Sequence, residues 1–308
     1  MLLVFISLIA CRTVNRNNDR LEGSITISGA FALYPMTVKW ADEFKKLHPK
    51  VKIDISAGGA GKGITDVLSK MVDIGMVSRD IYPEEFRKGA FTVATAKDAV
   101  VATISASNPK INDILSHGLK KNAANDIWIT GKYKNWGLAT EIKSDAPLRV
   151  YTRSDACGAA ESWAKYFGKK QEDLLGVGVF GDPGLAQAVT KDPLGIGYNN
   201  IIYVYDPKTK QQNPGIHVLP LDLNSNGKID ADENFYNTLD DIINAIASGK
   251  YPSPPARDLY FVTFGKPTKK ALVEFIQWVL TDGQKYVREA GYINLPNEKL
   301  ENELAKVK

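Results

Sequence analysis

Hydrophobic and polar residues alternate in residues 23–30 (GSITISGA), which predicts a β-strand at the start of the folded chain. Residues 34–49 then carry hydrophobic side chains at helical spacing, and Pro49 ends the pattern. Residues 51–57 and 73–79 again show strand patterns, with a glycine-rich turn and a second helical stretch between them. This β-α-β-α-β order is typical of an α/β fold with a mainly parallel sheet flanked by helices.

The rest of the chain continues this mixture of strands and helices, with one exception. Residues 99–107 form a long β pattern, and the segment after them shows no regular pattern until about Gly131. The further elements expected are strands at 147–153, 195–206 and 257–265, and helices at 159–168, 239–252 and 268–291. Since no repeat or flexible linker separates these elements, a second domain must arise by the chain crossing between domains.

Composition and charge exclude one class of partner. The 308 residues are 44% hydrophobic and 24% charged, which is ordinary for a globular protein of one large or two medium domains. The net charge is only +4, and no run of Lys and Arg concentrates it in one segment. We therefore expect no nucleic-acid partner.

The N-terminus resembles a secretion signal. Residues 1–10 are apolar but too few to span a bilayer, and Leu8–Cys11 resembles a bacterial lipobox. On this interpretation Cys11 becomes the lipidated first residue of the mature protein, and the lipid is its only contact with the membrane. An ordinary secretory signal is the alternative. We expect a protein of the periplasm or the cell surface, anchored to the membrane by lipid.

Three predicted turns from a strand into a helix are built from small residues, at 29–32, 58–63 and 156–160. The first turn of a helix has unpaired backbone N–H groups and a partial positive charge, so it attracts anions. In an open α/β sheet such turns gather at the carboxyl edge, where ligands bind. Arg153, just before the third turn, adds a planar fork of donors. The pattern predicts an anion site; the alternative is helices that simply pack closely.

Two catalytic kinds of site find no support in the sequence. The segment GGAGKGIT resembles a P-loop, but Gly63 follows Lys62 where a P-loop has Ser or Thr. Cys157 lies at a predicted helix N-terminus, which lowers a thiol pKa. None of the three histidines, however, lies in a context that indicates a catalytic partner for it. We therefore expect a protein that is not an enzyme.

The chain carries, in this order, the motifs SGAFALYP, GGAGKGI, VSRD, RSDACGA and YPSPPARDLYFVT. Together they resemble the phosphate-binding proteins of bacterial phosphate ABC importers. The resemblance implies a two-domain, type II periplasmic-binding-protein fold, with two crossover strands as a hinge and a ligand in the cleft between the domains. We expect a signal and tether at 1–21, domain 1 at 22–95 plus 258–308, and domain 2 at 96–257. We also expect a monomer that delivers its ligand to an ABC permease.

The same resemblance implies roles for individual residues. Arg153 matches the arginine that holds the ligand, and Asp155 either orients this arginine or accepts a proton from the ligand. Ser78 and Arg79 match the Ser-Arg pair of one branch of the family, where other branches have an aspartate in place of Arg79. The whole candidate set is Ala30, Phe31, Ala32, Gly59, Ala60, Ser78, Arg79, Arg153, Asp155, Cys157, Gly158 and Ala159.

This candidate set lacks hydroxyl groups that the family pattern contains. Alanine or cysteine stands at five positions where a hydroxyl is expected, namely Ala30, Ala32, Ala60, Cys157 and Ala159. Each neutral hydrogen bond lost in this way is worth about 1 kcal/mol. The ligand is then phosphate held by backbone N–H groups and two arginines, another oxyanion, or a different ligand.

Residues 222–233 (DLNSNGKIDADE) match the EF-hand calcium loop at every liganding position. The ligands expected are Asp222, Asn224, Asn226, the carbonyl oxygen of Lys228, Asp230 and Glu233. A strand pattern rather than a helix precedes the loop, so we expect Ca²⁺ as a structural cofactor and not as a signal. The alternative is a polar surface turn.

The sequence therefore predicts an extracytoplasmic solute-binding protein for phosphate or a similar tetrahedral oxyanion. A second hypothesis is an envelope sensor or surface interaction protein of the same fold that no longer serves transport. A third, an enzyme of phosphate esters, has no catalytic dyad or catalytic metal cluster in the sequence to support it.

Overall fold

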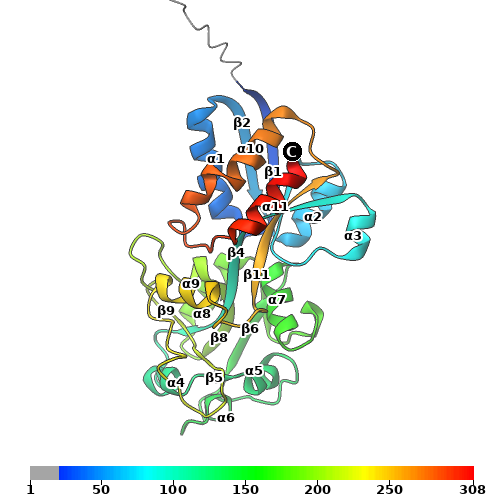
Figure 1. The fold of residues 1–308 in the computed structure, drawn as a ribbon. Helices are drawn as coiled ribbons and strands as arrows, with labels where there is room; N and C mark the ends of the chain where they lie inside the picture. Colours follow the sequence, from blue (N-terminus) through cyan, green and yellow to red (C-terminus); the bar gives the residue numbers. More distant parts are fainter. Residues whose placement is uncertain (1–20) are drawn as a thin grey trace, which may run out of the picture.

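The computed structural model describes residues 21–308, so Cys11 and the predicted signal lie outside the described residues. Figure 1 shows two domains, one above the other, with strands β4 (Ala90–Ser105) and β11 (Ala256–Phe264) running from one to the other. These are the two crossover strands that the family resemblance implies. Within the described residues, no helix combines the length and the apolar character needed to cross a membrane.

Strands and helices alternate along most of the chain. The strands are β1 (Glu22–Gly29), β2 (Lys50–Ala57), β3 (Ile74–Val77), β4 (Ala90–Ser105), β5 (Leu119–Lys120), β6 (Arg149–Arg153), β7 (Val177–Val179), β8 (Gly195–Asn200), β9 (Ile216–Val218), β10 (Leu221–Asp222) and β11 (Ala256–Phe264). The helices are α1 (Tyr34–Leu47), α2 (Ala60–Leu68), α3 (Pro83–Arg87), α4 (Ile111–His117), α5 (Lys121–Trp128), α6 (Trp136–Thr140), α7 (Gly158–Tyr166), α8 (Asp182–Lys191), α9 (Leu239–Ala247), α10 (Lys270–Leu280) and α11 (Asn297–Val307).

One sheet of nine strands runs through both domains in the order β2-β1-β3-β11-β4-β8-β6-β7, and β9 also pairs with β4. β1 is parallel to β2 and β3, and β6 is parallel to β7 and β8. The crossover strands are antiparallel to each other, from Ala90 opposite Phe264 to Ala99 opposite Ala256. The α/β type II fold is thus confirmed, with parallel strands inside each domain and an antiparallel pair at the hinge.

Each domain has a hydrophobic core of its own. One buried cluster draws its residues from 21–96 and 259–307, and the other from 99–256 together with Ile293. The chain therefore changes core within β4 and within β11. Each crossover strand packs in both cores and so connects the two domains.

The structure differs from the sequence prediction where elements are short. Helices α4 and α5 occupy the segment in which we expected no regular pattern. α4 has seven residues and buries only Ile114, whereas α5 buries Ala123, Ala124, Ile127 and Trp128 on one face. Helices of this length depend on packing against the rest of the domain, because two turns are too few for a clear periodicity.

Four more helices, α3, α6, α8 and α11, were not predicted. The start of α8 contains Gly181 and Pro183, residue types that are common in loops, although proline is also well suited to the first turn of a helix. α11 is exposed on most sides and buries only Glu303 and Val307. The stretch 195–206 is a strand only as far as Asn200, after which the chain forms a short 3-10 turn.

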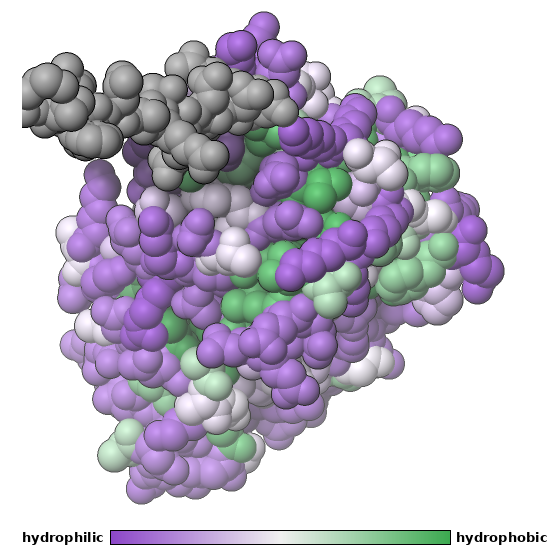
Figure 2. Space-filling model, turned by 45° about the horizontal axis from the view of Figure 1, so that its top comes forward, coloured by the Kyte–Doolittle hydropathy of each residue, from purple (hydrophilic) through white to green (hydrophobic). Residues whose placement is uncertain are grey.

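Figure 2 shows a face of the molecule on which hydrophilic residues predominate and hydrophobic residues form patches between them. The large hydrophobic side chains that are exposed are spread over many elements: Leu47, Met71, Phe86, Leu138, Leu175, Val177, Phe180, Leu223 and Phe264. Scattered exposed residues of this kind are normal for a globular protein. The exposed hydrophobic residues therefore do not by themselves mark a binding surface.

Candidate anion-binding cleft

The three turns of small residues follow β1, β2 and β6. The first two belong to domain 1 and the third to domain 2. Contact between them is direct, because the backbone N–H of Gly61, in the first turn of α2, donates to the carbonyl oxygen of Ala156 over 3.0 Å. The start of α2 and the turn before α7 thus meet across the cleft in a closed arrangement.

Glycine is required at two points of this contact. A Cβ atom at Gly158 would lie 2.1 Å from the backbone oxygen of Ser78 in the other domain. A Cβ atom at Gly59, whose φ of +90° also favours glycine, would lie 2.9 Å from the carbonyl oxygen of Ala156. A larger residue at either position would hold the domains apart. The small residues therefore permit close approach of the domains.

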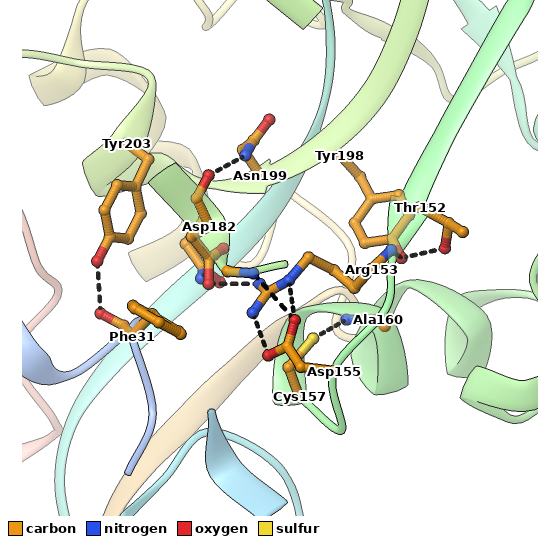
Figure 3. Close-up of polar contacts among 12 residues, drawn as sticks. Phe31, Thr152, Arg153, Asp155, Cys157, Ala160, Asp182, Tyr198, Asn199 and Tyr203 are labelled. Carbon is orange, nitrogen blue, oxygen red and sulfur yellow. Dashed lines mark hydrogen bonds and ion pairs between the residues drawn. The ribbon is translucent and has the colours of Figure 1, made fainter. Parts of the chain in front are cut away.

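Arg153 ends β6, and its side chain is fully buried. Its Nε and Nη2 donate to the two carboxylate oxygens of Asp155 over 2.8 and 2.6 Å, and its Nη1 donates to Oδ2 of Asp182 over 2.5 Å (Figure 3). Burial alone would lower the pKa of Arg153, but the surrounding negative charges, led by Asp182, outweigh burial and raise it. The guanidinium is therefore always charged, and two carboxylates balance it.

Asp182, the first residue of α8, joins Arg153 to further polar groups. Its Oδ1 accepts a hydrogen bond from Nδ2 of Asn200 over 2.6 Å, and its backbone oxygen accepts one from Nδ2 of Asn199 over 3.3 Å (Figure 3 shows the second). The amide oxygen of Asn200 accepts a hydrogen bond from Arg257 of β11. A continuous chain of polar contacts thus runs from Arg153 in the cleft to the hinge strands.

The hinge end of this chain is a buried pair of opposite charges. Oδ2 of Asp98, in β4, lies 3.6 Å from Nη2 of Arg257. Burial raises the pKa of Asp98 to about 7, and the charge of Arg257 only partly opposes this shift. The carboxyl group of Asp98, in a strand that connects the two domains, therefore holds its proton more readily than an exposed carboxyl group does.

Next to Arg153, the first loop of domain 1 contributes backbone groups and an aromatic ring rather than charge. Three candidate residues on its side are almost completely buried and have no polar side chain: Ala30, Ala32 and Ala60. The carbonyl oxygen of Phe31 accepts a hydrogen bond from the hydroxyl of Tyr203 over 2.9 Å (Figure 3). The Phe31 ring centre lies 5.7 Å from the Arg153 guanidinium, within reach of a cation–π contact. Phe31 is thus the residue of this loop that contacts domain 2 through both its backbone and its ring.

Cys157 caps helix α7. Its Sγ accepts a hydrogen bond from the backbone N–H of Ala160 over 3.4 Å (Figure 3). Burial raises the pKa of the thiol to about 12, although the charge of Arg153 opposes the shift. The thiol is therefore protonated at neutral pH and is not an activated nucleophile. The neighbouring Ala159 packs in the core of domain 2.

Comparison with known proteins shows to which family this chain belongs. A family profile described as a PBP superfamily domain matches residues 15–283, which is most of the chain. The chain belongs to the PBP superfamily. The resemblance drawn from its motifs is therefore confirmed at the level of the family.

Within the PBP superfamily, the chain is similar to PstS proteins. It is 30% identical to the phosphate-binding protein PstS of Bacillus subtilis over 198 residues, which cover 63% of this chain and 62% of the relative. It is 25% identical to the phosphate-binding protein PstS of Methanocaldococcus jannaschii over 336 residues, which cover 92% and 85%. A crystal structure from Clostridium perfringens, described as a phosphate ABC transporter substrate-binding protein with bound phosphate, matches with a TM-score of 0.72 at 24% identity. That match covers 89% of this chain and 100% of the other.

Arg79 of this PBP-superfamily protein belongs to a different polar cluster from Arg153. Its Nη1 and Nη2 donate to the two carboxylate oxygens of Glu85 over 2.9 and 2.7 Å, and its guanidinium carbon lies 4.1 Å from the centre of the Tyr82 ring. It lines a groove of about 660 Å³ between the domains, beside Arg257. The two predicted arginines therefore pair with different carboxylates, Arg153 with Asp155 and Asp182 and Arg79 with Glu85.

Sequence reasoning missed three members of the cleft network. Asp182 lies between Gly181 and a proline at a fourth turn from a strand into a helix, so the signal used for the other three turns applies to it as well. Arg257 lies in one of the motifs that carry the resemblance, but its place in the network depends on how β11 pairs with β4. Asn200 ends a strand and carries no signal of its own.

The predicted calcium loop of this PBP-superfamily protein lies apart from the cleft. β10, where the loop begins, is paired with β5, and Figure 1 places β5 with α4 and α6 at the end of domain 2 that faces away from domain 1. The anion candidates and the calcium candidates are therefore two separate regions of the molecule.

Proposed function

We propose that this protein is an extracytoplasmic solute-binding protein that captures phosphate, or a similar tetrahedral oxyanion, between its domains and delivers it to an ABC permease. The names of the PstS relatives and the phosphate in the Clostridium perfringens structure support this proposal. Like those relatives, the protein is a binding protein and not an enzyme. A monomeric state and a lipid anchor at Cys11 are parts of the proposal.

The observation that carries the proposal is the buried Arg153 beside the bare start of α7. A guanidinium has five N–H groups, and three of those of Arg153 donate to Asp155 and Asp182. The remaining two are the donors that we assign to an oxygen of the ligand. In the first turns of α2 and α7, the N–H of Gly61 donates to Ala156 and the N–H of Ala160 donates to Cys157. The further donors that we assign to the anion are the N–H groups of the other residues in these two turns.

The charges around Arg153 favour an anion that still carries a proton. Asp155 and Asp182 both form ion pairs with Arg153, so these three groups together have one excess negative charge. A fully ionised dianion such as sulfate meets repulsion from the carboxylates. Hydrogen phosphate carries the same two negative charges, but its P–OH group offsets the repulsion by donating a hydrogen bond to a carboxylate oxygen, which has a second lone pair for it. We therefore expect phosphate and arsenate to bind more tightly than sulfate.

Calorimetric titration with phosphate, arsenate, sulfate, molybdate and tungstate tests the proposal. Arg153→Ala should weaken phosphate binding at least tenfold, or about 1.4 kcal/mol, because charge-assisted bonds from a guanidinium are the strong ones. Arg153→Lys keeps the charge opposite Asp155 and Asp182 but loses the planar fork, so it should also weaken binding while preserving the fold. Melting curves of both variants check that they remain folded.

The titrations also separate the proposal from the second hypothesis. If folded Arg153→Lys binds phosphate as tightly as the unmodified protein, the ligand is not held at Arg153. If none of the five anions binds the unmodified protein, the proposal fails, and a sensor or surface interaction protein of the same fold takes its place.

A further inference from the structure

Two carboxylates of the segment 222–233 are buried without a counter-charge. Asp222 is 2% exposed and Glu233 is 3% exposed. Within residues 21–308, neither forms an ion pair with a Lys, Arg or His side chain; the loop lysine, Lys228, pairs with Asp230 instead. Buried charges in proteins are normally paired or bound to a metal, so these two carboxylates call for a cation.

The bonds that the two carboxylates make are all to backbone N–H groups of the loop. Oδ2 of Asp222 accepts from Gly227 over 2.7 Å. Oε1 of Glu233 accepts from Leu223 and Asn224 over 2.8 and 2.9 Å. These bonds fold the loop back on itself and place both carboxylates on its inner side, but they do not neutralise two negative charges.

We propose that residues 222–233 bind one Ca²⁺ ion. The loop supplies only oxygen ligands at the six positions, which suits calcium: Asp222, Asn224, Asn226, the carbonyl oxygen of Lys228, Asp230 and Glu233. Gly227 stands at the sixth position with a φ of +85°, as the sharp turn requires.

The loop needs no compact cluster of acidic side chains for this. Within residues 21–308, no group of three His, Cys, Asp or Glu side chains gathers closely enough to hold a metal. In a loop of this pattern, Asp222 and Glu233 bind the ion directly, whereas Asp230, at the ninth position, acts through a water molecule. The other ligands are amide and carbonyl oxygens, which carry no charge.

The position of the loop indicates what the ion stabilises. The backbone N–H of Ile229 donates to the carbonyl oxygen of Ser116, at the end of α4, over 2.9 Å. The Ile229 side chain lies against Gly118, where a Cβ atom would be 2.3 Å from its Cδ1. β10, which contains Asp222, pairs with β5. An ion in the loop therefore stabilises the contacts of α4 and β5 with the loop and with β10, at the outer end of domain 2.

Calcium titration of the full chain after treatment with EDTA tests this proposal. We expect one bound Ca²⁺ per chain and a melting temperature raised by roughly 5 °C or more at a hundredfold excess of Ca²⁺ over its Kd. Glu233→Gln should abolish both effects, because the twelfth position supplies two of the oxygens. The matched control is Asp232→Asn, which removes one charge from the same loop at a position that is not a ligand and should leave both effects intact.

Since Glu233→Gln also weakens bonds within the loop, the quantity to compare is the difference in melting temperature with and without Ca²⁺, not the melting temperature itself. The proposal would be overturned if calorimetry detected no Ca²⁺ binding and EDTA left the melting temperature unchanged. It would also be overturned if Mg²⁺ raised the melting temperature as much as Ca²⁺. Phosphate affinity should change less than tenfold on adding Ca²⁺. A larger change would overturn the structural role and show that the loop is coupled to the cleft.

Discussion

The two walls of the cleft differ in how they present themselves to a ligand. Where it meets the turn before α7, the domain 1 wall is made of backbone and small side chains at the start of α2, among them the buried Ala60. The domain 2 wall holds a fully buried arginine, Arg153, between the carboxylates of Asp155 and Asp182. One wall therefore determines how closely the domains approach, and the other determines which charge the cleft accepts.

This difference implies that closure and selectivity can be changed separately. A change of volume where the walls touch should alter affinity for all anions alike, because each of them needs the closed form. A change of charge beside Arg153 should instead alter the ratio between anions. The two kinds of variant therefore test whether one wall determines closure and the other determines selectivity between anions.

The largest effect is expected from Gly158→Ala. The added Cβ atom would lie 2.1 Å from the backbone oxygen of Ser78, and a backbone atom cannot move aside as a flexible side chain can. The domains should then be unable to close fully, and affinity for phosphate should fall about a hundredfold, or about 2.7 kcal/mol. Calorimetry measures the affinity, and small-angle X-ray scattering with and without phosphate measures closure.

The matched control for this prediction is Gly184→Ala in α8, where the nearest neighbour of the added Cβ is a Val179 methyl group at 3.2 Å. Both variants replace glycine by alanine within a helix, so both should keep or slightly raise the melting temperature. Unchanged phosphate affinity of Gly158→Ala would show that binding does not need the close contact seen here.

A smaller effect, on selectivity, is expected from Asp182→Asn. The substitution removes one of the two carboxylates that balance Arg153 and leaves an amide of the same shape. Removing a like charge several ångströms from the ligand, at an effective dielectric constant of about 20, is worth roughly 2 kcal/mol. Affinity for sulfate should rise tenfold or more, and the preference for phosphate over sulfate should shrink.

A control for this charge change is Asp113→Asn, an exposed position on α4 in the same domain. It alters the net charge equally and should leave both affinities unchanged, because solvent screens distant surface charges. A folded Asp182→Asn variant that bound sulfate no better would mean that Asp182 only holds Arg153 in place.

The comparison of the walls also shows what the sequence could and could not predict. The sequence predicts the three turns from composition alone, because a run of small residues before a helix can be recognised without knowledge of the fold. Arg153 and Asp155 lie two residues apart, so their contact is local, and orienting Arg153 is one of the two roles that the family resemblance implies for Asp155. Contacts within a few residues of one another are those that sequence reasoning can find.

The partners of Arg153 from farther along the chain could not be found in this way. Asp182 reaches Arg153 only because α8 follows β7 beside β6, and Asn200 reaches Arg257 only because β8 and β11 both flank β4. Pairing of strands distant in sequence decides such contacts, and no single sequence displays it. Arg79 is a different case: the family resemblance implies that it contacts the ligand, and the structure pairs it with Glu85, six residues farther along the chain.

The smallest effect is expected from Cys157→Ser, which restores a hydroxyl on the domain 2 wall. The sulfur of Cys157 accepts the N–H of Ala160 over a long 3.4 Å, and serine is a much better residue for this capping position. We expect the free energy of unfolding to rise by about 0.5 to 1 kcal/mol. Phosphate affinity should rise by no more than about fivefold, because one neutral hydrogen bond is worth about 1 kcal/mol.

Cys157→Ala separates the two contributions of this position, since it removes the cap and cannot donate to the ligand. Urea unfolding should rank the three proteins as serine, cysteine and alanine in order of decreasing stability. Calorimetry should give the cysteine and alanine forms similar affinities for phosphate and the serine form a higher affinity, because a buried thiol is a weak donor. If all three proteins unfold at the same urea concentration and bind phosphate equally, residue 157 neither caps α7 nor faces the anion. The domain 2 wall would then act through Arg153 and its two carboxylates alone.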